Sequence, residues 1–128
     1  MSEYILSELT DQIIRCYYDV YNTLGYGFLE KVYENAMLIR FQEVGLAALN
    51  QVPLKVYFHN KIVGKYFADI IVENKIILEL KAESKLDFKS VSQLVNYLKA
   101  TEIEVGLVLN FGEKPEIRRK IFTNNLKK

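Results

Sequence analysis

The sequence predicts an α/β domain in which helices pack on a mixed sheet, in the element order ααβββαβ. Two segments near the start space their apolar residues by three and four, as amphipathic helices do. Three short segments rich in Val, Ile, Tyr and Phe follow, separated by turns that contain Asn. One more helical pattern and one short apolar strand complete the order.

The bulk properties place the chain among ordinary globular proteins. Its 128 residues suit one domain spanning positions 1–128, and half of them are hydrophobic. The net charge of +1 neither indicates nor excludes a polyanionic partner. Cys16 is the only cysteine, which excludes an intrachain disulfide and a cysteine-only metal site. No signal peptide and no apolar run near ~20 residues is visible, so we expect a cytoplasmic protein with no membrane contact.

The two predicted helices are bounded by glycines. The first runs from about Ser7 to Leu24, with Thr10 or Ser7 as its candidate capping residue. Gly25-Tyr26-Gly27 ends it. The second runs from about Phe28 to Val44, and Gly45 ends it.

The next three segments predict an antiparallel meander of Gln51–His59, Ile62–Val72 and Ile76–Lys81. Asn60-Lys61 and Glu73-Asn74-Lys75 separate them, and Asn tolerates the backbone of tight turns. The remaining assignments are a loop at Ala82–Phe88, a helix at Ser90–Ala100, a central strand at Val105–Leu109, a loop at Asn110–Pro115 and a basic closing segment, Ile117–Leu126, without an assigned state.

Two charges interrupt the apolar strand that reads IILELK. Glu79 and Lys81 are two residues apart, so they share one face of the strand. The other face carries only aliphatic side chains, which supply the core. Because a buried unpaired charge costs several kcal/mol, these two residues need a partner or a function.

Asp69 is a lone charge in the preceding apolar strand. If Glu73-Asn74-Lys75 forms a three-residue loop, Val72 opposes Ile76 and Asp69 opposes Glu79 on the same face. A two-residue loop at Asn74-Lys75 would instead send the two carboxylates to different faces. The site therefore requires an odd number of residues in this loop, or a bulge that restores the parity.

Two facing carboxylates repel each other unless a cation or a proton lies between them. Their hard oxygen ligands favour Mg²⁺ or Mn²⁺, and Mg²⁺ takes one or two carboxylates together with phosphate oxygens. Lys81 can orient or deprotonate a water or hold a phosphate, so the set suits metal-assisted phosphodiester hydrolysis. The other interpretation is an exposed sheet edge at which Lys81 pairs with one carboxylate.

These residues resemble a known pattern. Asp69, a gap of ten positions and then Glu79-Leu80-Lys81 resemble the PD-(D/E)xK nuclease superfamily, with Phe67-Ala68 where its Pro would stand. Gln93 to Tyr97 is similar to the QxxxY element of RecB-like members. The segment Gly27 to Tyr33 matches the motif of the GxxExxY family, a small-protein branch of that superfamily. The resemblance covers nearly the whole chain.

The resemblance implies a three-layer, restriction-endonuclease-type core and a role for each matching residue. Asp69, Glu79 and the carbonyl of Leu80 would bind Mg²⁺ or Mn²⁺. Lys81 would act on the nucleophilic water or on the phosphate. Glu30 would be a further metal ligand or a partner of Lys81. Gln93 and Tyr97, four apart on one helix face, would position the substrate backbone or the lysine.

Several of these residues also have a structural interpretation. Glu30 and Glu34 lie in the first turns of a helix, where acids suit the helix dipole. Tyr33 is expected to pack, His59 to lie in a solvated turn, and Cys16 to be a buried inert thiol. The basic run 118–120 is expected to form a solvated face, although it can contact phosphates. No clustered aromatic platform of the kind found in single-strand binders is visible.

Three functions follow as hypotheses. The first is a metal-dependent nuclease acting on nucleic acid, with DNA favoured by the superfamily resemblance. The second is a non-catalytic module that keeps the nuclease fold and acts with a protein partner or as a homo-oligomer. The third is a small-molecule phosphoesterase that uses the same residues.

Overall fold

The computed structural model describes residues 5–127. Its helices are α1 (Ser7–Leu24), α2 (Glu30–Glu43), α3 (Phe88–Lys99) and the short 3-10 helix η2 (Asn124–Leu126). Its strands are β1 (Ala48–Phe58), β2 (Lys61–Val72), β3 (Ile76–Lys81), β4 (Val105–Phe111) and β5 (Pro115–Ile121). The predicted order ααβββαβ is confirmed, and one strand follows it.

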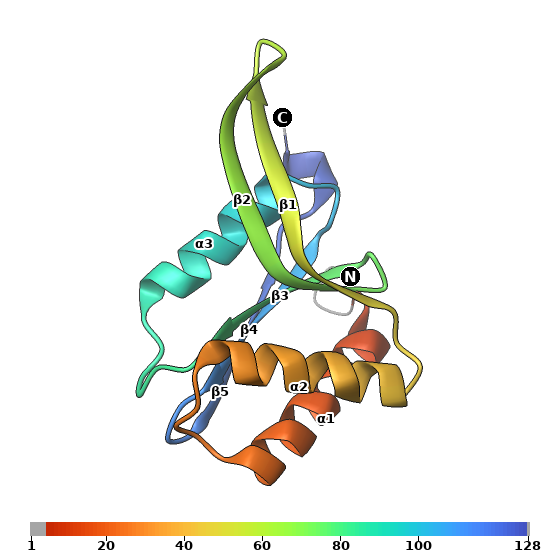
Figure 1. Cartoon of the computed structure of the whole chain (residues 1–128). Coiled ribbons are helices and arrows are strands. Elements are labelled where there is room, and N and C mark those ends of the chain that lie inside the picture. The colour runs from red at the N-terminus through yellow and green to blue at the C-terminus, as the bar shows by residue number, and fades with distance from the viewer. Residues whose placement is uncertain (1–4, 128) are drawn as a thin grey trace.

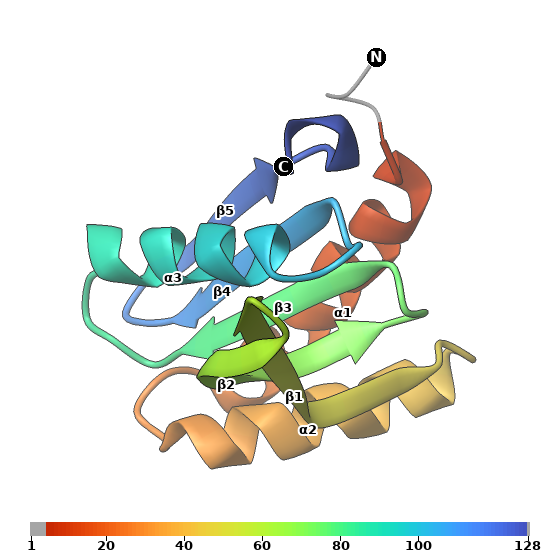
Figure 2. The ribbon, with the colours of Figure 1, turned by 90° about the horizontal axis from the view of Figure 1, so that it is seen from above.

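The strands form one mixed sheet in the order β1-β2-β3-β4-β5. Neighbouring strands are antiparallel except β3 and β4, which are parallel and are joined through α3. Figure 2 shows α3 on one side of the sheet and α1 and α2 on the other. This is the layered α/β arrangement that the sequence predicts.

Each face of the sheet has its own core. Ile76, Leu78 and Leu80 of β3 pack with buried residues of α1 and α2. Ile77, from the same strand, packs instead with Leu94 and other residues of α3. The alternation of a strand thus divides β3 between two cores, and Glu79 points to the side of α3.

The closing segment is where the sequence prediction falls short. Asn110 and Phe111 belong to β4, and Pro115 begins β5, so the loop shrinks to residues 112–114. β5 pairs along all of β4, from Phe111 with Pro115 to Val105 with Ile121. Its charged residues concealed the strand pattern, because an edge strand needs only its few inward side chains to be apolar.

Two turn assignments also need correction. Leu6, and not Ser7 or Thr10, stands at the N-cap of α1, with φ of 57° and no side-chain cap hydrogen bond. Phe58 pairs with Lys61, so His59-Asn60 is the β1–β2 turn in place of the predicted Asn60-Lys61. Both turn residues have positive φ, as a two-residue type I′ turn requires.

The hairpin of β1 and β2 bends along its length (Figure 1), and we assign the bend to Gln51 from its left-handed backbone. Gln51 has φ of 50°, although the register stays unchanged from Asn50–Ile70 to Val52–Ala68. Below the bend, Ile70 packs with the core of α1 and α2. Above it, Ala68 packs with the core of α3. Residues 68 and 70 are two apart, so a regular strand would place both side chains on the same face. The left-handed residue therefore switches the face that the hairpin presents.

Candidate functional site

The turn between β2 and β3 has the length that the site requires. Val72 pairs with Ile76, and Ile70 pairs with Leu78. Continuing this register sets Asp69 opposite Glu79. Asp69 Oδ2 accepts a 2.8 Å hydrogen bond from the backbone N–H of Leu80, which holds the carboxylate against β3.

Glu79 is a buried acid without full compensation. Its side chain is 3% exposed, and Oε1 has no hydrogen-bond partner. Burial, and then the charge of Asp69, raise the pKa of Glu79 to about 9. Burial also raises the pKa of Asp69, although its hydrogen bonds with Leu80 and Glu79 act in the opposite direction. In the absence of a cation, the raised pKa of Glu79 favours its protonated form beside Asp69.

Lys81 and Glu30 extend the site beyond this pair. Lys81, half-buried at the end of β3, lies near enough to lower the pKa of Asp69, Glu79 and Glu30. Glu30 is the first residue of α2, and its carboxylate accepts a hydrogen bond from the backbone of Ala82. Loss of hydration raises the pKa of Glu30, which Lys81 partly offsets. The end of β3 and the start of α2 therefore meet at this site.

Gln93 and Tyr97 face the same region from α3. Gln93 Nε2 donates a 2.7 Å hydrogen bond to the hydroxyl of Tyr97, so the two share a helix face as predicted. Burial and then the charge of Glu79 raise the pKa of Tyr97 to about 12. The phenol thus lies near the carboxyl pair and stays protonated.

Glu34 is the residue that the sequence interpretation missed. It is 5% exposed, not a solvated acid of the helix start. Its carboxylate accepts hydrogen bonds from Lys31 at 2.9 Å and from Asn50 and Gln51 at 3.0 Å. Burial alone would raise the pKa of Glu34, but these hydrogen bonds outweigh it and lower the pKa. Its spacing of four from Glu30 was the available signal, because such residues share a helix face.

Tyr33 holds the loop that leads to Glu30. Its hydroxyl donates to the carbonyl of Gly25 at 2.6 Å and accepts from the backbone N–H of Phe28 at 3.2 Å. Its ring stacks on Phe111, with the centroids 4.1 Å apart. The prediction that Tyr33 packs is confirmed, and it also fixes the start of α2.

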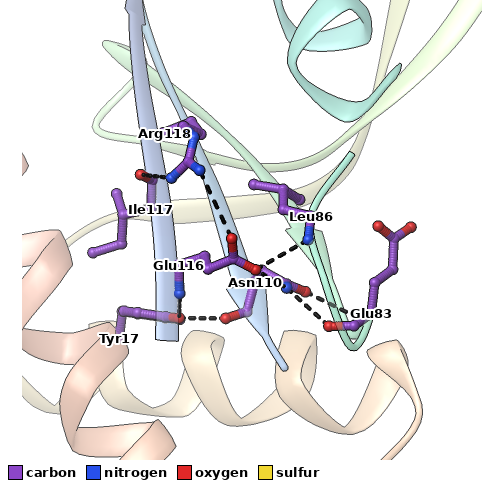
Figure 3. Close-up of polar contacts among 7 residues, drawn as sticks. All are labelled: Tyr17, Glu83, Leu86, Asn110, Glu116, Ile117 and Arg118. Atoms are coloured by element: carbon purple, nitrogen blue, oxygen red, sulfur yellow. Dashed lines mark hydrogen bonds and ion pairs between the residues drawn. The ribbon is translucent and has the colours of Figure 1, made fainter. Parts of the chain in front are cut away.

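A buried polar network anchors the loop that follows Lys81 (Figure 3). Asn110 of β4 is fully buried, and its side chain exchanges two 2.9 Å hydrogen bonds with the backbone of Glu83. Glu116 of β5 accepts from Asn110 at 3.1 Å and from the backbone N–H of Leu86 at 3.0 Å. Tyr17 of α1 joins the network by donating to the carbonyl of Asn110. The exit of β3 is therefore tied to three other elements.

Gly112 lets this loop approach the sheet. A Cβ added to Gly112 would lie 2.3 Å from the carbonyl oxygen of Glu83, which no side chain can do. The close approach to Glu83 explains why a glycine follows Asn110-Phe111, although Gly112 does not have the left-handed backbone that usually requires glycine.

The donor set suits a hard divalent cation, although a full ligand cage is not preformed. Within residues 5–127, no group of three or more His, Cys, Asp or Glu side chains is arranged to hold a metal ion. Asp69 and Glu79 remain as a pair, and the buried Oε1 of Glu79 lacks a partner. Two carboxylates are what Mg²⁺ commonly takes from a protein when a phosphate supplies other oxygens.

The other candidate residues have structural places. His59 is exposed in the hairpin turn, as predicted. Cys16 is buried, and burial raises the pKa of its thiol, so it is not a poised nucleophile. Arg118, whose side chain is exposed, lies 3.7 Å from the partly buried Glu116. None of the helices in the described part of the chain is long and apolar enough to cross a membrane.

Comparison with known proteins identifies the superfamily of the chain. The family model of the PD-(D/E)XK nuclease superfamily matches residues 7–120, which include every residue of the site. Searches of curated proteins and of solved structures found no match. The mixed five-stranded sheet with flanking helices is consistent with a restriction-endonuclease-like fold. The chain belongs to the PD-(D/E)XK nuclease superfamily.

Proposed function

We propose that this protein is a metal-dependent nuclease that hydrolyses phosphodiester bonds in nucleic acid, with DNA as the favoured substrate. The supporting observation is the buried Glu79, with its unpartnered oxygen, opposite the half-buried Asp69 and beside Lys81. Such an arrangement is costly in a resting protein and useful to one that binds a cation.

Asp69, Glu79 and the carbonyl of Leu80 would hold the cation, Mg²⁺ or Mn²⁺. When bound, such an ion supplies Lewis-acid chemistry and lowers the pKa of a coordinated water. The hydrogen bond from the Leu80 N–H orients the Asp69 carboxylate for this role. To serve as a ligand, Glu79 would have to be in its ionised form, so metal binding would be coupled to the release of a proton from Glu79.

Lys81 would hold the scissile phosphate or take the proton of the attacking water. The charge of Lys81 partly offsets the rise in the pKa of Glu30, so the two side chains interact. This interaction favours Glu30 as a partner of Lys81. A direct contact of Glu30 with the metal remains the alternative. Gln93 and Tyr97 would position the substrate backbone through the Tyr97 hydroxyl, which Gln93 orients.

The GxxExxY branch of the superfamily is part of this proposal. Gly27, Glu30 and Tyr33 carry its motif. Tyr33 ties down the loop before α2, so the motif fixes the position at which Glu30 meets β3. These contacts support the view that Gly27 and Tyr33 of the motif help to position Glu30.

The decisive experiment compares cleavage by the wild type, Asp69→Asn and Lys81→Ala with Mg²⁺ or Mn²⁺. Labelled single- and double-stranded DNA and RNA, together with nucleotides, serve as substrates. We expect wild-type cleavage of a nucleic acid that EDTA abolishes and that both variants lose by at least about 100-fold. Lys75→Ala, an exposed turn residue at the other end of β3, is the control and should cleave normally. Equal behaviour of all four proteins would overturn the proposal.

A non-catalytic nuclease-fold module is the second candidate. The observation in its favour is that the described residues contain no three-acid metal cluster. Calorimetric titration of folded protein with Mn²⁺ separates the two. Heat that Asp69→Asn removes supports the nuclease, whereas no heat and no cleavage support the module.

A further inference from the structure

The hairpin outside the bend, residues 52–68, has an unusual charge composition, and we name it the arm. It contains Lys55, Lys61 and Lys65 and no Asp or Glu. All three lysines are exposed, and Lys55 lies directly opposite Lys65 in the ladder. Like charges that face each other across a ladder destabilise it, so this pair favours an anionic partner.

The arm also exposes aromatic rings that the linear sequence scatters. Tyr57, Phe58, Tyr66 and Phe67 are between 44% and 63% exposed. The ring of His59 stacks on Phe58 with centroids 4.0 Å apart, which makes a two-ring tip. Lys65 Nζ lies 5.5 Å from the centre of the Phe67 ring, so charge and ring are presented together. Folding thus places exposed rings at two levels of one hairpin, Tyr57 and Phe58 at its tip and Tyr66 and Phe67 nearer its base.

The arm projects from the body of the protein and begins at the candidate site. Figure 1 shows the hairpin rising beyond the sheet, and Figure 2 shows it pointing toward the viewer. Lys65 is four residues from Asp69, a span of roughly 13 Å along an extended strand. A polymer held by the arm would therefore reach Asp69 and Glu79 without a second binding element.

Edge protection explains only part of this surface. β1 is an edge strand, and lysines on an edge discourage pairing with another chain. Exposed Tyr57, Phe58 and Phe67 have the opposite effect, because apolar side chains on an edge promote association. Cations interleaved with exposed rings instead match a single-stranded nucleic acid, whose phosphates bind lysines and whose bases stack on rings.

We propose that the arm binds an unpaired nucleic-acid strand through Lys55, Lys65 and the aromatic tip, and leads it to the candidate site. The inference rests on the proposed function, since it assumes a nucleic-acid substrate. It adds that the substrate has a single-stranded region next to the bond that is cut.

Binding is measured by fluorescence anisotropy on a labelled oligothymidylate in EDTA, so that no cleavage is needed. The double variant K55Q/K65Q should bind about 10-fold or more weakly at moderate salt. Its plot of log affinity against log salt should be shallower by about 1.4, from ~0.7 for each lost phosphate contact. The control K75Q/K114Q removes the same charge from exposed lysines outside the arm and should bind as the wild type does. Equal loss in both double variants would overturn the proposal.

Phe58→Leu tests the aromatic part, because leucine keeps an apolar side chain and removes the ring. We expect about 5- to 150-fold weaker binding, as for one lost base stack. Light scattering on the same samples tests whether the exposed rings of the arm bind a second copy of the chain and not a nucleic acid. A wild-type dimer that Phe58→Leu dissociates, with nucleic-acid affinity unchanged, would overturn the proposal.

The outcomes separate this inference from the proposed nuclease activity. Cleavage by the wild type with unchanged binding by K55Q/K65Q would refute the arm and leave the nuclease standing. Arm-dependent binding without cleavage under any metal would refute the nuclease and leave the arm standing. No binding of the oligonucleotide by the wild type would refute the arm outright.

Discussion

Gln51 lies across from Asp69 in the β1–β2 ladder, between the pairs Asn50–Ile70 and Val52–Ala68. Its backbone is left-handed, a conformation that costs a non-glycine residue about 1–3 kcal/mol. Its side chain donates to the buried Glu34, whose charge in turn raises the pKa of Asp69. The strained residue and the buried acid are therefore parts of one structure next to the candidate site.

Glu34→Ala should lower the free energy of unfolding by about 2–4 kcal/mol, because it leaves Asn50 and Gln51 without their acceptor. Urea unfolding at neutral pH measures it. Glu43→Ala removes an acid of the same helix from an exposed pair with Arg40 and should cost at most about 1 kcal/mol. Equal losses would show that the Glu34 network is not specially stabilising.

The Glu34 contribution should also depend on pH with a definite sign. Its folded-state pKa is lowered from 4.5, so the unfolded chain takes up a proton first as the solution is acidified. The stabilisation is present above the ordinary carboxyl pKa and is lost as the pH falls through the folded pKa. The difference in stability between the wild type and Glu34→Gln should shrink in acid, and a constant difference would contradict this.

Glu79 should show the opposite pH dependence in metal-free protein. Its pKa is raised from 4.5 to about 9, so between these values the folded state holds a proton that the unfolded chain has released. Stability therefore falls as the pH rises, by up to about 1.4 kcal/mol per pH unit from this group. Glu79→Gln removes this slope, so its stability advantage should grow from pH 5 to 8 in EDTA. Parallel curves would contradict the prediction.

Asn110→Ala should loosen the loop after Lys81 without removing any residue of the candidate site. The change leaves both backbone groups of Glu83 without partners, and we expect a loss of about 2–4 kcal/mol. Trypsin should also cut faster at Lys85 in the freed loop. Asn96→Ala, on the exposed face of α3, should change neither the stability nor the cutting rate. Resistance of the Asn110 variant equal to the wild type would contradict this role.

Tyr33→Phe should weaken the loop before Glu30 while keeping the ring stacked on Phe111. The loss of two hydrogen bonds should cost about 1–2 kcal/mol. Hydrogen exchange gives a local measure, since the amide of Phe28 loses its acceptor and should exchange faster. Tyr26→Phe, an exposed tyrosine of the same loop, is the control. An unchanged Phe28 amide would show that the hydroxyl does not hold the loop.

The sequence predicted what depends on local periodicity. Alternation along β3 and the length of the following turn are properties of neighbouring residues, so the opposition of Asp69 and Glu79 was correct. The helix face shared by Gln93 and Tyr97 was predicted for the same reason. The closing segment received no assignment from the sequence, because charge concealed the inward positions of β5.

The remaining features depend on contacts between distant parts of the chain. The left-handed backbone of Gln51 cannot be read from a residue type that rarely adopts it. The burial of Glu34 arises from a helix and a strand that only the fold brings together. The hairpin presents exposed rings at two levels, because Tyr57 and Phe58 lie next to its turn while Tyr66 and Phe67 pair with Leu54 and Pro53 nearer its base.

The bend at Gln51 inserts no unpaired residue into the ladder, because Asn50–Ile70 and Val52–Ala68 on its two sides keep the same register. Strand pairs can therefore be inserted or deleted outside the bend without shifting Asp69 against Glu79. The length of the hairpin and the geometry of the candidate site are therefore structurally independent of each other.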